Sequence, residues 1–169
     1  MTELRTTALR TLTPEDWRLW RGLRLTALAE APGAFGSRLA DWQGAGDREE
    51  RWRDRLATPG THLVAELDGV PAGMASGVPG EHPGTAELIS MWVARDARGH
   101  GVGDLLIRAV ETWAAGTGAA VLTLAVADGN EPAAALYRRN GFEDSGERGL
   151  MPDGRPERFM AKRLPAAPV

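Results

Sequence analysis

The chain has 169 residues, of which 43% are hydrophobic and 25% are charged, as expected for one globular domain with a substantial core. Its formal net charge of -3 provides no general basic field for nucleic acid, and the lack of cysteine excludes disulfides and thiolate metal sites. The three histidines lack metal-ligand spacing, and no apolar run approaches the ~18 residues of a membrane span. We therefore expect no metal, nucleic acid or membrane partner. We expect cytoplasmic localisation because no charged-then-apolar segment marks the N-terminus.

The first third of the chain predicts a strand and two helices. Residues 6–12 alternate weakly, as a first strand does, and residues 13–16 (Thr-Pro-Glu-Asp) supply an N-cap, a proline and two acids. The helix that follows carries tryptophans and leucines to about Glu30. Residues 31–37 contain the proline and glycines of a loop, and a charged helix is predicted from about Asp47 to Ala57.

A hairpin and a further strand are predicted next. Residues 61–67 and 70–78 flank Asp68-Gly69, a dipeptide that favours the type I′ turn of a two-residue hairpin. Residues 86–93 form another apolar run with the length and β-branched content of a strand.

Residues 98–103 (Arg-Gly-His-Gly-Val-Gly) join that strand to an amphipathic helix. The apolar side chains of one helical face are Val102, Leu105, Leu106, Ala109, Val110 and Trp113. A glycine-rich turn before a helix leaves backbone N–H groups unpaired at the positive end of the helix dipole, which favours an anion. Glycines at 99, 101 and 103 let a phosphate approach the backbone closely. The alternative is a turn that only ends a strand.

The spacing of this turn distinguishes between kinds of phosphate loop. The dinucleotide fingerprint G-x-G-x-x-G requires a third glycine where Asp104 stands, and the nucleotide-triphosphate loop requires a lysine, whereas the only lysine is Lys162. The pattern Arg98-x-x-Gly101-x-Gly103 instead resembles the pyrophosphate loop of the GNAT acyltransferases, Gln/Arg-x-x-Gly-x-Gly/Ala.

A second motif supports the same resemblance. Residues 119–126 predict the next strand, and residues 130–142 follow it with the family's second block, Asn-x-x-Ala-x-x-Leu-Tyr-x-x-x-Gly-Phe, matched at every fixed position. Independently of the resemblance, this segment has the sequence features of a helix. Asp128 or Asn130 can cap its start, and Gly141 tolerates the positive φ that ends it.

The resemblance covers roughly residues 60–164 and implies the GNAT fold. A terminal hairpin is predicted from residues 142–150 and 156–164. We predict an α/β (α+β) fold with a mixed, mostly antiparallel sheet, splayed central strands and flanking helices. One N-acetyltransferase domain is expected over residues 1–164, with a flexible tail at 165–169.

The resemblance also implies acetyl-CoA as cosubstrate, wedged between the splayed fourth and fifth strands. Its pantetheine arm would run along the fourth strand and its pyrophosphate would lie on the glycine turn. The residues that this predicts as cofactor-binding are Met91, Trp92, Val93, Arg98, Gly99, His100, Gly101, Val102, Gly103, Asp104 and Asn130. Asp104 departs from the basic or small residue of many relatives, and an acid near the diphosphate costs binding affinity unless its side chain turns away. Helix capping explains Asn130 equally well.

The activity that the resemblance implies is direct transfer of an acetyl group from the thioester to a primary amine of a small molecule or peptide. Tyr137 matches the family's general acid, which protonates the departing thiolate, and the Val93 N–H can stabilise the thioester oxygen. Some relatives carry a glutamate where Ala125 stands, so Glu87 on the fourth strand becomes the candidate base. Weaker alternatives are Asp128, Glu66, His62 and a water chain.

Other functions remain open at this stage. A catalytically silent acyl-CoA-binding regulatory module would keep the glycine turn, and a non-enzymatic interaction domain would bind no CoA. An unrelated nucleotide binder would prefer ATP or NAD. The acceptor side is expected at residues 31–42 and 145–158, where Phe35, Trp42 and Met151 are candidates for an apolar wall. The resemblance does not identify the acceptor, and it is compatible with a homodimer.

Overall fold

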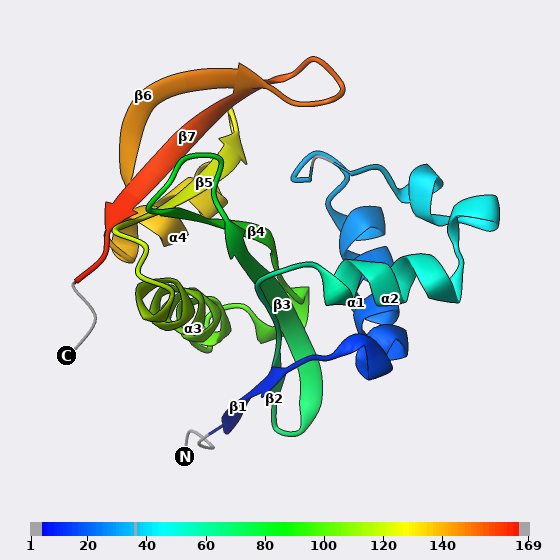
Figure 1. Ribbon diagram of the computed structural model, residues 1–169. Coiled ribbons are helices and arrows are strands. Elements are labelled where there is room, and N and C mark those ends of the chain that lie inside the picture. The colour runs from blue at the N-terminus through cyan, green and yellow to red at the C-terminus, as the bar shows by residue number, and fades with distance from the viewer. Residues whose placement is uncertain (1–4, 36, 166–169) are drawn as a thin grey trace.

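The computed structural model describes residues 5–35 and 37–165, and its centre is one seven-stranded sheet with helices on both faces (Figure 1). The strands are β1 (Thr7–Thr11), β2 (Thr61–Leu67), β3 (Val70–Pro79), β4 (Thr85–Val93), β5 (Val121–Ala127), β6 (Glu143–Leu150) and β7 (Pro156–Arg163). The helices are α1 (Trp17–Glu30), α2 (Glu49–Ala57), α3 (Val102–Gly116) and α4 (Glu131–Arg139). Short 3-10 turns are η1 (Pro14–Asp16), η2 (Leu39–Trp42), η3 (Gly44–Gly46) and η4 (Arg95–Ala97).

The strand order is β1-β2-β3-β4-β5-β7-β6, and every neighbouring pair is antiparallel except β4 and β5. These two parallel strands pair only from Thr85↔Val121 to Glu87↔Thr123 and then part. The predicted mixed, mostly antiparallel sheet with splayed central strands and flanking helices is therefore confirmed. The parting leaves the backbone edge of the second half of β4 without a strand partner on that side.

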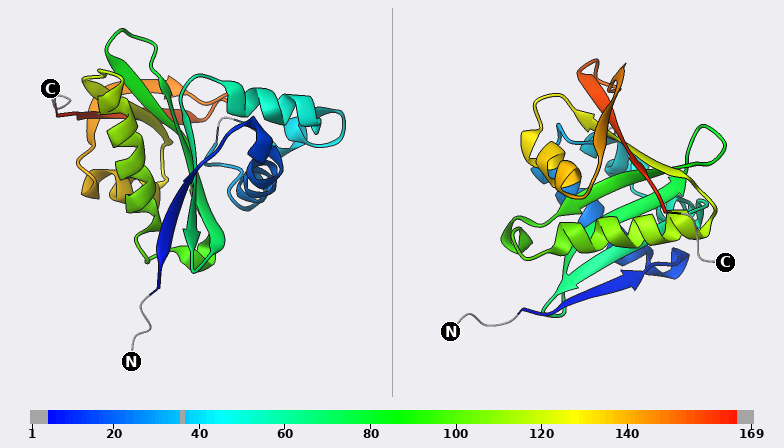
Figure 2. Two further views of the ribbon diagram at one scale, coloured as in Figure 1. Left: turned by 60° about the horizontal axis from the view of Figure 1, so that its bottom comes forward. Right: turned by 90° about the vertical axis from the view of Figure 1, so that its left-hand side faces the viewer.

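The helices divide into two layers, with α3 and α4 on one face of the sheet and α1 and α2 on the other (Figure 2). On the first face, Leu106 and Val110 of α3 are fully buried in a cluster with Leu122 of β5. On the second face, Trp20 and Trp52 are fully buried against the sheet. Burial of these large apolar side chains fixes both layers to the sheet.

The predicted hairpin turn is confirmed, whereas the predicted start of the second helix shifts by two residues. Asp68 and Gly69 both have positive φ (53° and 80°), which confirms the type I′ turn. The second helix begins at Glu49 rather than near Asp47, because the Asp47 carboxylate accepts hydrogen bonds from Arg21 and from the Trp52 indole at 2.8 Å each.

The strand predicted from residue 119 begins at Val121, because the Ala119 N–H still closes the end of α3 by donating to the Ala114 carbonyl at 3.2 Å. The terminal hairpin forms as predicted from β6 and β7. Of the predicted tail, residues 166–169 lie outside the described residues. None of the helices in the described part of the chain combines the length and apolar character needed to cross a membrane.

Candidate active site

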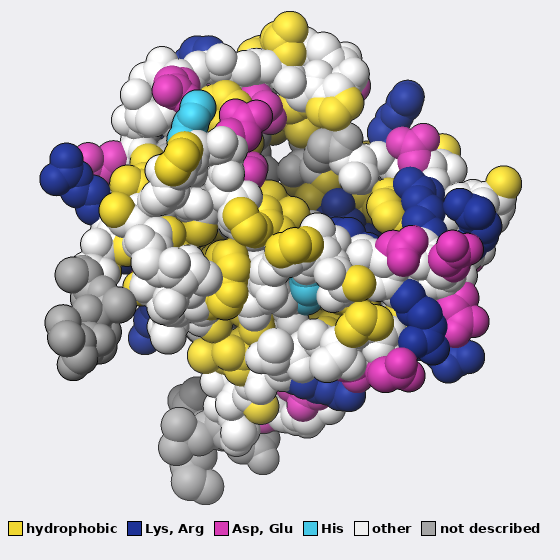
Figure 3. Space-filling model, viewed as in Figure 1, with side chains coloured by type: hydrophobic (Ala, Val, Ile, Leu, Met, Phe, Trp, Pro, Cys, Tyr) yellow, Lys and Arg dark blue, Asp and Glu magenta, His cyan; other side chains and the backbone are white. Residues whose placement is uncertain are grey.

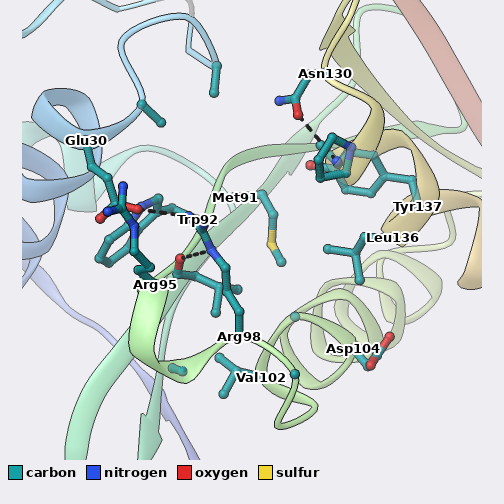
Figure 4. Close-up of a pocket in the computed structure, with 18 of the residues that line it drawn as sticks. Glu30, Met91, Trp92, Arg95, Arg98, Val102, Asp104, Asn130, Leu136 and Tyr137 are labelled. Carbon is teal, nitrogen blue, oxygen red and sulfur yellow. Dashed lines mark hydrogen bonds and ion pairs between the residues drawn. The ribbon is translucent and has the colours of Figure 1, made fainter.

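A cavity of about 760 Å³ lies where β4 parts from β5, between the end of α1, the start of α3 and the face of α4. In the close-up, Glu30 and Arg98 lie on one side of it and Tyr137, Leu136 and Asn130 on the other, with Met91 between them (Figure 4). The space-filling view shows the surface hollowed between the central strands and the α1–α2 layer, with acidic side chains on the strand side and both basic and acidic ones over the helix layer (Figure 3).

A bulge in β4 determines which side chains face the cavity. The register passes from Met74↔Trp92 to Ser76↔Ile89, so Ser90 and Met91 together oppose one residue of β3, and Ser90 has a positive φ of 56°. Beyond the bulge the alternation of side chains is inverted. Trp92 therefore joins the α1–α2 cluster, and Met91 packs beside α3 and α4 at the cavity.

The backbone of Val93 faces away from β3. The Ala94 N–H donates to the Ala72 carbonyl at 2.8 Å, and alternate residues of an antiparallel strand direct their N–H and C=O groups to opposite sides. Val93 therefore presents both groups toward the parted β5. Its carbonyl accepts one hydrogen bond, from Arg98 Nε at 3.3 Å. The Val93 N–H thus faces the gap between β4 and β5, and its role as a donor to a thioester oxygen stays a prediction.

The glycine turn has the shape of an anion site. Gly99 and Gly101 have φ of 82° and 83°, and an ideal Cβ at either position would meet no atom within 4 Å, so both face open space. Within the described residues, no hydrogen bond is found for the backbone N–H groups of residues 99–104. These donors and the N-terminal end of the 15-residue helix α3 favour an anionic ligand.

Gly103 has a different role from the one expected of it. A Cβ there would lie 3.1 Å from Leu136 and 3.5 Å from Met91, so this glycine allows α3 to pack closely against α4. His100 is exposed and is not among the residues that line the cavity, whereas the other predicted cofactor-binding residues all line it.

Asp104 turns away from the turn, as its chemistry required. Its carboxylate accepts a hydrogen bond from Asn140 Nδ2 at 2.8 Å and from Arg139 Nη2 at 3.3 Å, both near the end of α4. The pKa of Asp104 is lowered, mainly by the hydrogen bond from Asn140. Partial burial raises it, and the charge of Arg139 lowers it further. The acid is therefore compensated by α4 and ties α3 to α4 at the rim of the cavity.

Tyr137 projects from α4 into the cavity (Figure 4). It is 8% exposed, it packs edge-on against Phe142 at 6.0 Å between ring centroids, and burial raises its pKa to about 12. The phenol is therefore protonated at neutral pH and can act as a proton donor. Asn130 caps α4, since its side chain accepts a hydrogen bond from the Ala133 N–H at 3.4 Å, and it also lines the cavity. Asp128 is not the cap.

Glu87 lies at the last paired position between β4 and β5, opposite Thr123, and is not among the residues that line the cavity. Its neighbours Ala86 and Leu88 are in the α3–α4 core, so Glu87 points to the other face. Burial raises the pKa of Glu87, and the nearby acids Glu81 and Glu157 raise it further.

The expected apolar wall is only partly present. Phe35 lines the cavity, but Trp42 and Met151 do not. Trp42 packs on Trp52 with ring centroids 4.6 Å apart, and Met151 is buried elsewhere, so both serve packing. Among residues 5–35 and 37–165, no group of three or more His, Cys, Asp or Glu side chains is placed to hold a metal ion.

Sequence reasoning did not single out two basic side chains of the α1–α2 layer, neither of which lines the cavity itself. Arg24 is buried in α1, and Arg55, half-buried in α2, donates to Ser76 and Ser90. The signal was present in the helix pattern, because Arg24 stands four residues after Trp20 and four before Leu28, on the buried face.

Parted central strands, a glycine turn at a helix N-terminus and a buried phenol facing it define a transferase-type α/β domain that can hold a phosphate-bearing ligand between its strands. The chain belongs to the acetyltransferase (GNAT) family, whose sequence profile matches residues 23–142. The comparison with curated proteins found no significant match.

Solved structures with the same fold cover nearly the whole chain. PaiA N-acetyltransferase from Thermoplasma acidophilum, in complex with coenzyme A, is 18% identical with a TM-score of 0.73 and covers 94% of this chain and 99% of its own. YncA from Salmonella typhimurium, a putative acetyltransferase solved with acetyl-CoA, is 21% identical with a TM-score of 0.73, covering 97% and 98%. Ribosomal-protein-alanine N-acetyltransferase from Brucella melitensis is 27% identical with a TM-score of 0.67, covering 93% and 99%.

Proposed function

We propose that the protein is an acyl-CoA-dependent N-acyltransferase that transfers acetyl from acetyl-CoA to a primary amine by direct attack. The observation that carries this proposal is the arrangement of one cavity, with the free donors of residues 99–104 at one end and the Tyr137 phenol across from them. Family membership and relatives solved with coenzyme A or acetyl-CoA support it.

The residues present fit such a ligand. A side chain at Gly99 or Gly101 would meet open space, and no hydrogen bond is found for the backbone N–H groups of residues 99–104 in the described chain, so these donors can hold a diphosphate. The free edge of β4 at Met91 and Val93 can hydrogen-bond an extended amide-bearing arm as an added strand would. Bound acetyl-CoA would supply an acetyl thioester, which an amine can attack without a covalent enzyme intermediate.

Each chemical role then falls to a group of this chain. The Val93 N–H stabilises the negative charge that develops on the acyl oxygen. The new bond joins the amine nitrogen to the acyl carbon as the carbon–sulfur bond breaks, and Tyr137 donates its proton to the sulfur. The amine must also lose a proton, and we assign this to Glu87 acting through water. Glu87 does not line the cavity, but its raised pKa makes it a stronger base than an ordinary carboxylate.

The test is turnover by the purified protein with acetyl-CoA and a panel of amino acids, polyamines, peptides and aminoglycosides. We expect release of free CoA that depends on one class of amine, with the acetylated product identified by mass spectrometry. Acetyl-CoA binding without turnover across the panel would instead support the silent acyl-CoA-binding module. A lack of any CoA-dependent shift in melting temperature would contradict both and favour an interaction domain.

A further inference from the structure

Arg24 is a buried cation without a partner among the described residues. The residue is 8% exposed, and its Nη1 atom has no hydrogen-bond partner. The ring of Phe35 lies over the guanidinium, with Cζ 4.6 Å from the ring centroid, but an aromatic face does not replace an anion. Burial, and then the charge of Arg55, lowers the pKa of Arg24 to about 10, so the group is still charged at neutral pH.

Arg55 adds a second charge that nothing nearby balances. Its guanidinium donates to His62 Nδ1 at 3.2 Å, to Ser76 Oγ at 3.3 Å and to Ser90 Oγ at 3.2 Å. His62 is neutral at pH 7, because burial foremost lowers its pKa, and its Nε2 donates to the Thr58 carbonyl at 3.0 Å. All of these acceptors are uncharged, so two guanidiniums face one another without a carboxylate partner.

The other buried side-chain groups without a partner near Arg24 and Arg55 are also donors, and we call this set of residues the donor-rich wall. The indole Nε1 of Trp92, which lines the cavity, is buried without an acceptor. The same holds for Trp17 and Trp20, which stand on the helix that carries Arg24. Buried polar groups in folded proteins are normally paired, so a region whose unpaired buried groups are all donors is suited to a ligand that brings acceptors and negative charge.

This donor-rich wall adjoins the proposed acetyl-transfer cavity. Phe35, which covers Arg24, lines the cavity, and Ser90, which binds Arg55, immediately precedes the cavity residue Met91. The opposite flank carries acids, because Glu87 lies within the electrostatic influence of Glu81 and Glu157. In the space-filling view, acidic side chains lie on the strand side of the hollow, and the helix layer carries both basic and acidic ones (Figure 3).

We propose that Arg24, supported by the charge of Arg55, binds a carboxylate of the acceptor, and that the acceptor is therefore a free amino acid or a close analogue. This inference rests on the proposed acetyl transfer. A guanidinium binds a carboxylate through two parallel hydrogen bonds, and the acids near Glu87 attract the ammonium group of the same molecule. An α-amino acid carries both charges on one carbon, whereas the N-terminus of a peptide has no carboxylate at that position.

The experiment compares acceptors that differ only in the carboxylate. Standard amino acids are assayed with acetyl-CoA beside the amino alcohol of each one that is acetylated, which keeps the amine and the side chain but removes the negative charge. We expect the wild-type protein to prefer the amino acid by about 10- to 150-fold in kcat/KM, the range for loss of a charge-assisted hydrogen bond.

The variant Arg24→Met should remove this preference, because it should raise KM for the amino acid far more than KM for the amino alcohol. Arg18→Met is the matched control, because Arg18 stands on the same helix but is exposed, and it should keep the wild-type preference. Arg24→Met should also raise the melting temperature, since it removes a buried charge that has no partner. Arg24→Lys retains the charge and should keep part of the preference.

Binding provides a readout that does not need turnover. Amino acids are titrated calorimetrically into wild-type protein saturated with CoA, and into Arg24→Met. If amino acids bind through their carboxylate but are not acetylated, the proposed carboxylate site at Arg24 is supported and the proposed acetyl transfer is contradicted. Equal turnover of amino acids and amino alcohols by the wild-type protein would overturn the subsite while transfer stands. Absence of amino-acid binding together with acetylation of peptides would likewise overturn it.

Discussion

The Arg98 guanidinium joins two sides of the cavity through Glu30. Arg98 Nη2 donates to Glu30 Oε1 at 2.9 Å, and Arg98 Nε donates to the Val93 carbonyl at 3.3 Å. Glu30 is the last residue of α1 and Val93 the last of β4, so one side chain connects the helix layer to the free strand edge. The Val93 carbonyl therefore already accepts a hydrogen bond from Arg98, whereas a bound pantetheine arm would need the same carbonyl as an acceptor.

Glu30→Gln is expected to tighten CoA binding by about two- to five-fold, because Arg98 is then released from the strand edge and becomes available to phosphate. The effect is small because a surface ion pair contributes only ~0–1 kcal/mol. Calorimetric titration of CoA measures it, with Glu15→Gln as control, since Glu15 pairs with Arg53 instead. Weaker binding by Glu30→Gln would mean that the ion pair holds Arg98 in its ligand-binding position.

Gly101→Asp is expected to weaken CoA binding by ~10²-fold or more, because a carboxylate would occupy the open space in front of the turn and repel phosphate. Gly118→Asp is the matched control. Gly118 lies beyond the other end of α3 with a similar φ of 88° and equally open space, so both substitutions carry the same backbone strain. Arg98→Ala should weaken binding less than Gly101→Asp. Equal CoA affinities for both glycine variants would show that the turn does not hold the phosphates.

Much of the fold could be predicted because its signals are local. The Asp68-Gly69 turn, the helix cap at Asn130 and the glycines before α3 each depend on a few neighbouring residues, and each is found as expected. The start of α2 was misplaced because Asp47 is held by Arg21, a partner distant in sequence.

The site was less predictable where it depends on tertiary pairing. The bulge at Ser90 arises from the pairing of β4 with β3 and has no clear sequence signal, yet it directs Met91 into the cavity. Arg24 was overlooked because a charged residue in an amphipathic helix is normally assigned to the solvated face. Its spacing from Trp20 indicated the buried face, and only the structure shows that no carboxylate accompanies it.

Glu87→Gln is expected to reduce turnover most at a pH above the pKa of the Glu87 carboxyl and below that of the acceptor amine, where the wild-type base is ionised and free amine is scarce. CoA affinity should be nearly unchanged. With Glu87 as base, the wild-type rate rises as pH passes through the raised pKa of its carboxyl, and the variant lacks this rise. Glu66→Gln tests the alternative base and should keep the wild-type profile. Identical pH–rate profiles for wild type and Glu87→Gln would assign the proton to water or another group.

Glu87 should also make stability depend on pH. Because its pKa is higher in the folded protein than in the unfolded chain, the protonated side chain favours folding, and that contribution is lost as pH rises through the folded pKa. Glu87→Gln, which is neutral throughout, should therefore melt at a higher temperature than the wild type near pH 7. The difference should disappear below about pH 4, where the wild-type carboxyl is protonated in both states. Differential scanning calorimetry at both pH values is the check.

Tyr137→Phe is expected to keep the fold and CoA affinity and to lower turnover by roughly 10²-fold, near the lower limit for general acid catalysis. The change removes one hydroxyl and keeps the ring that packs on Phe142. Because a thiol has a pKa near ~8.5, thiolate leaves tolerably well without help, and the loss should shrink with more activated thioesters. Phe142→Leu disturbs the same packing without touching the phenol, so it should lower the melting temperature with little change in kcat. Wild-type turnover by a well-folded Tyr137→Phe, measured with an identified acceptor, would restrict Tyr137 to packing.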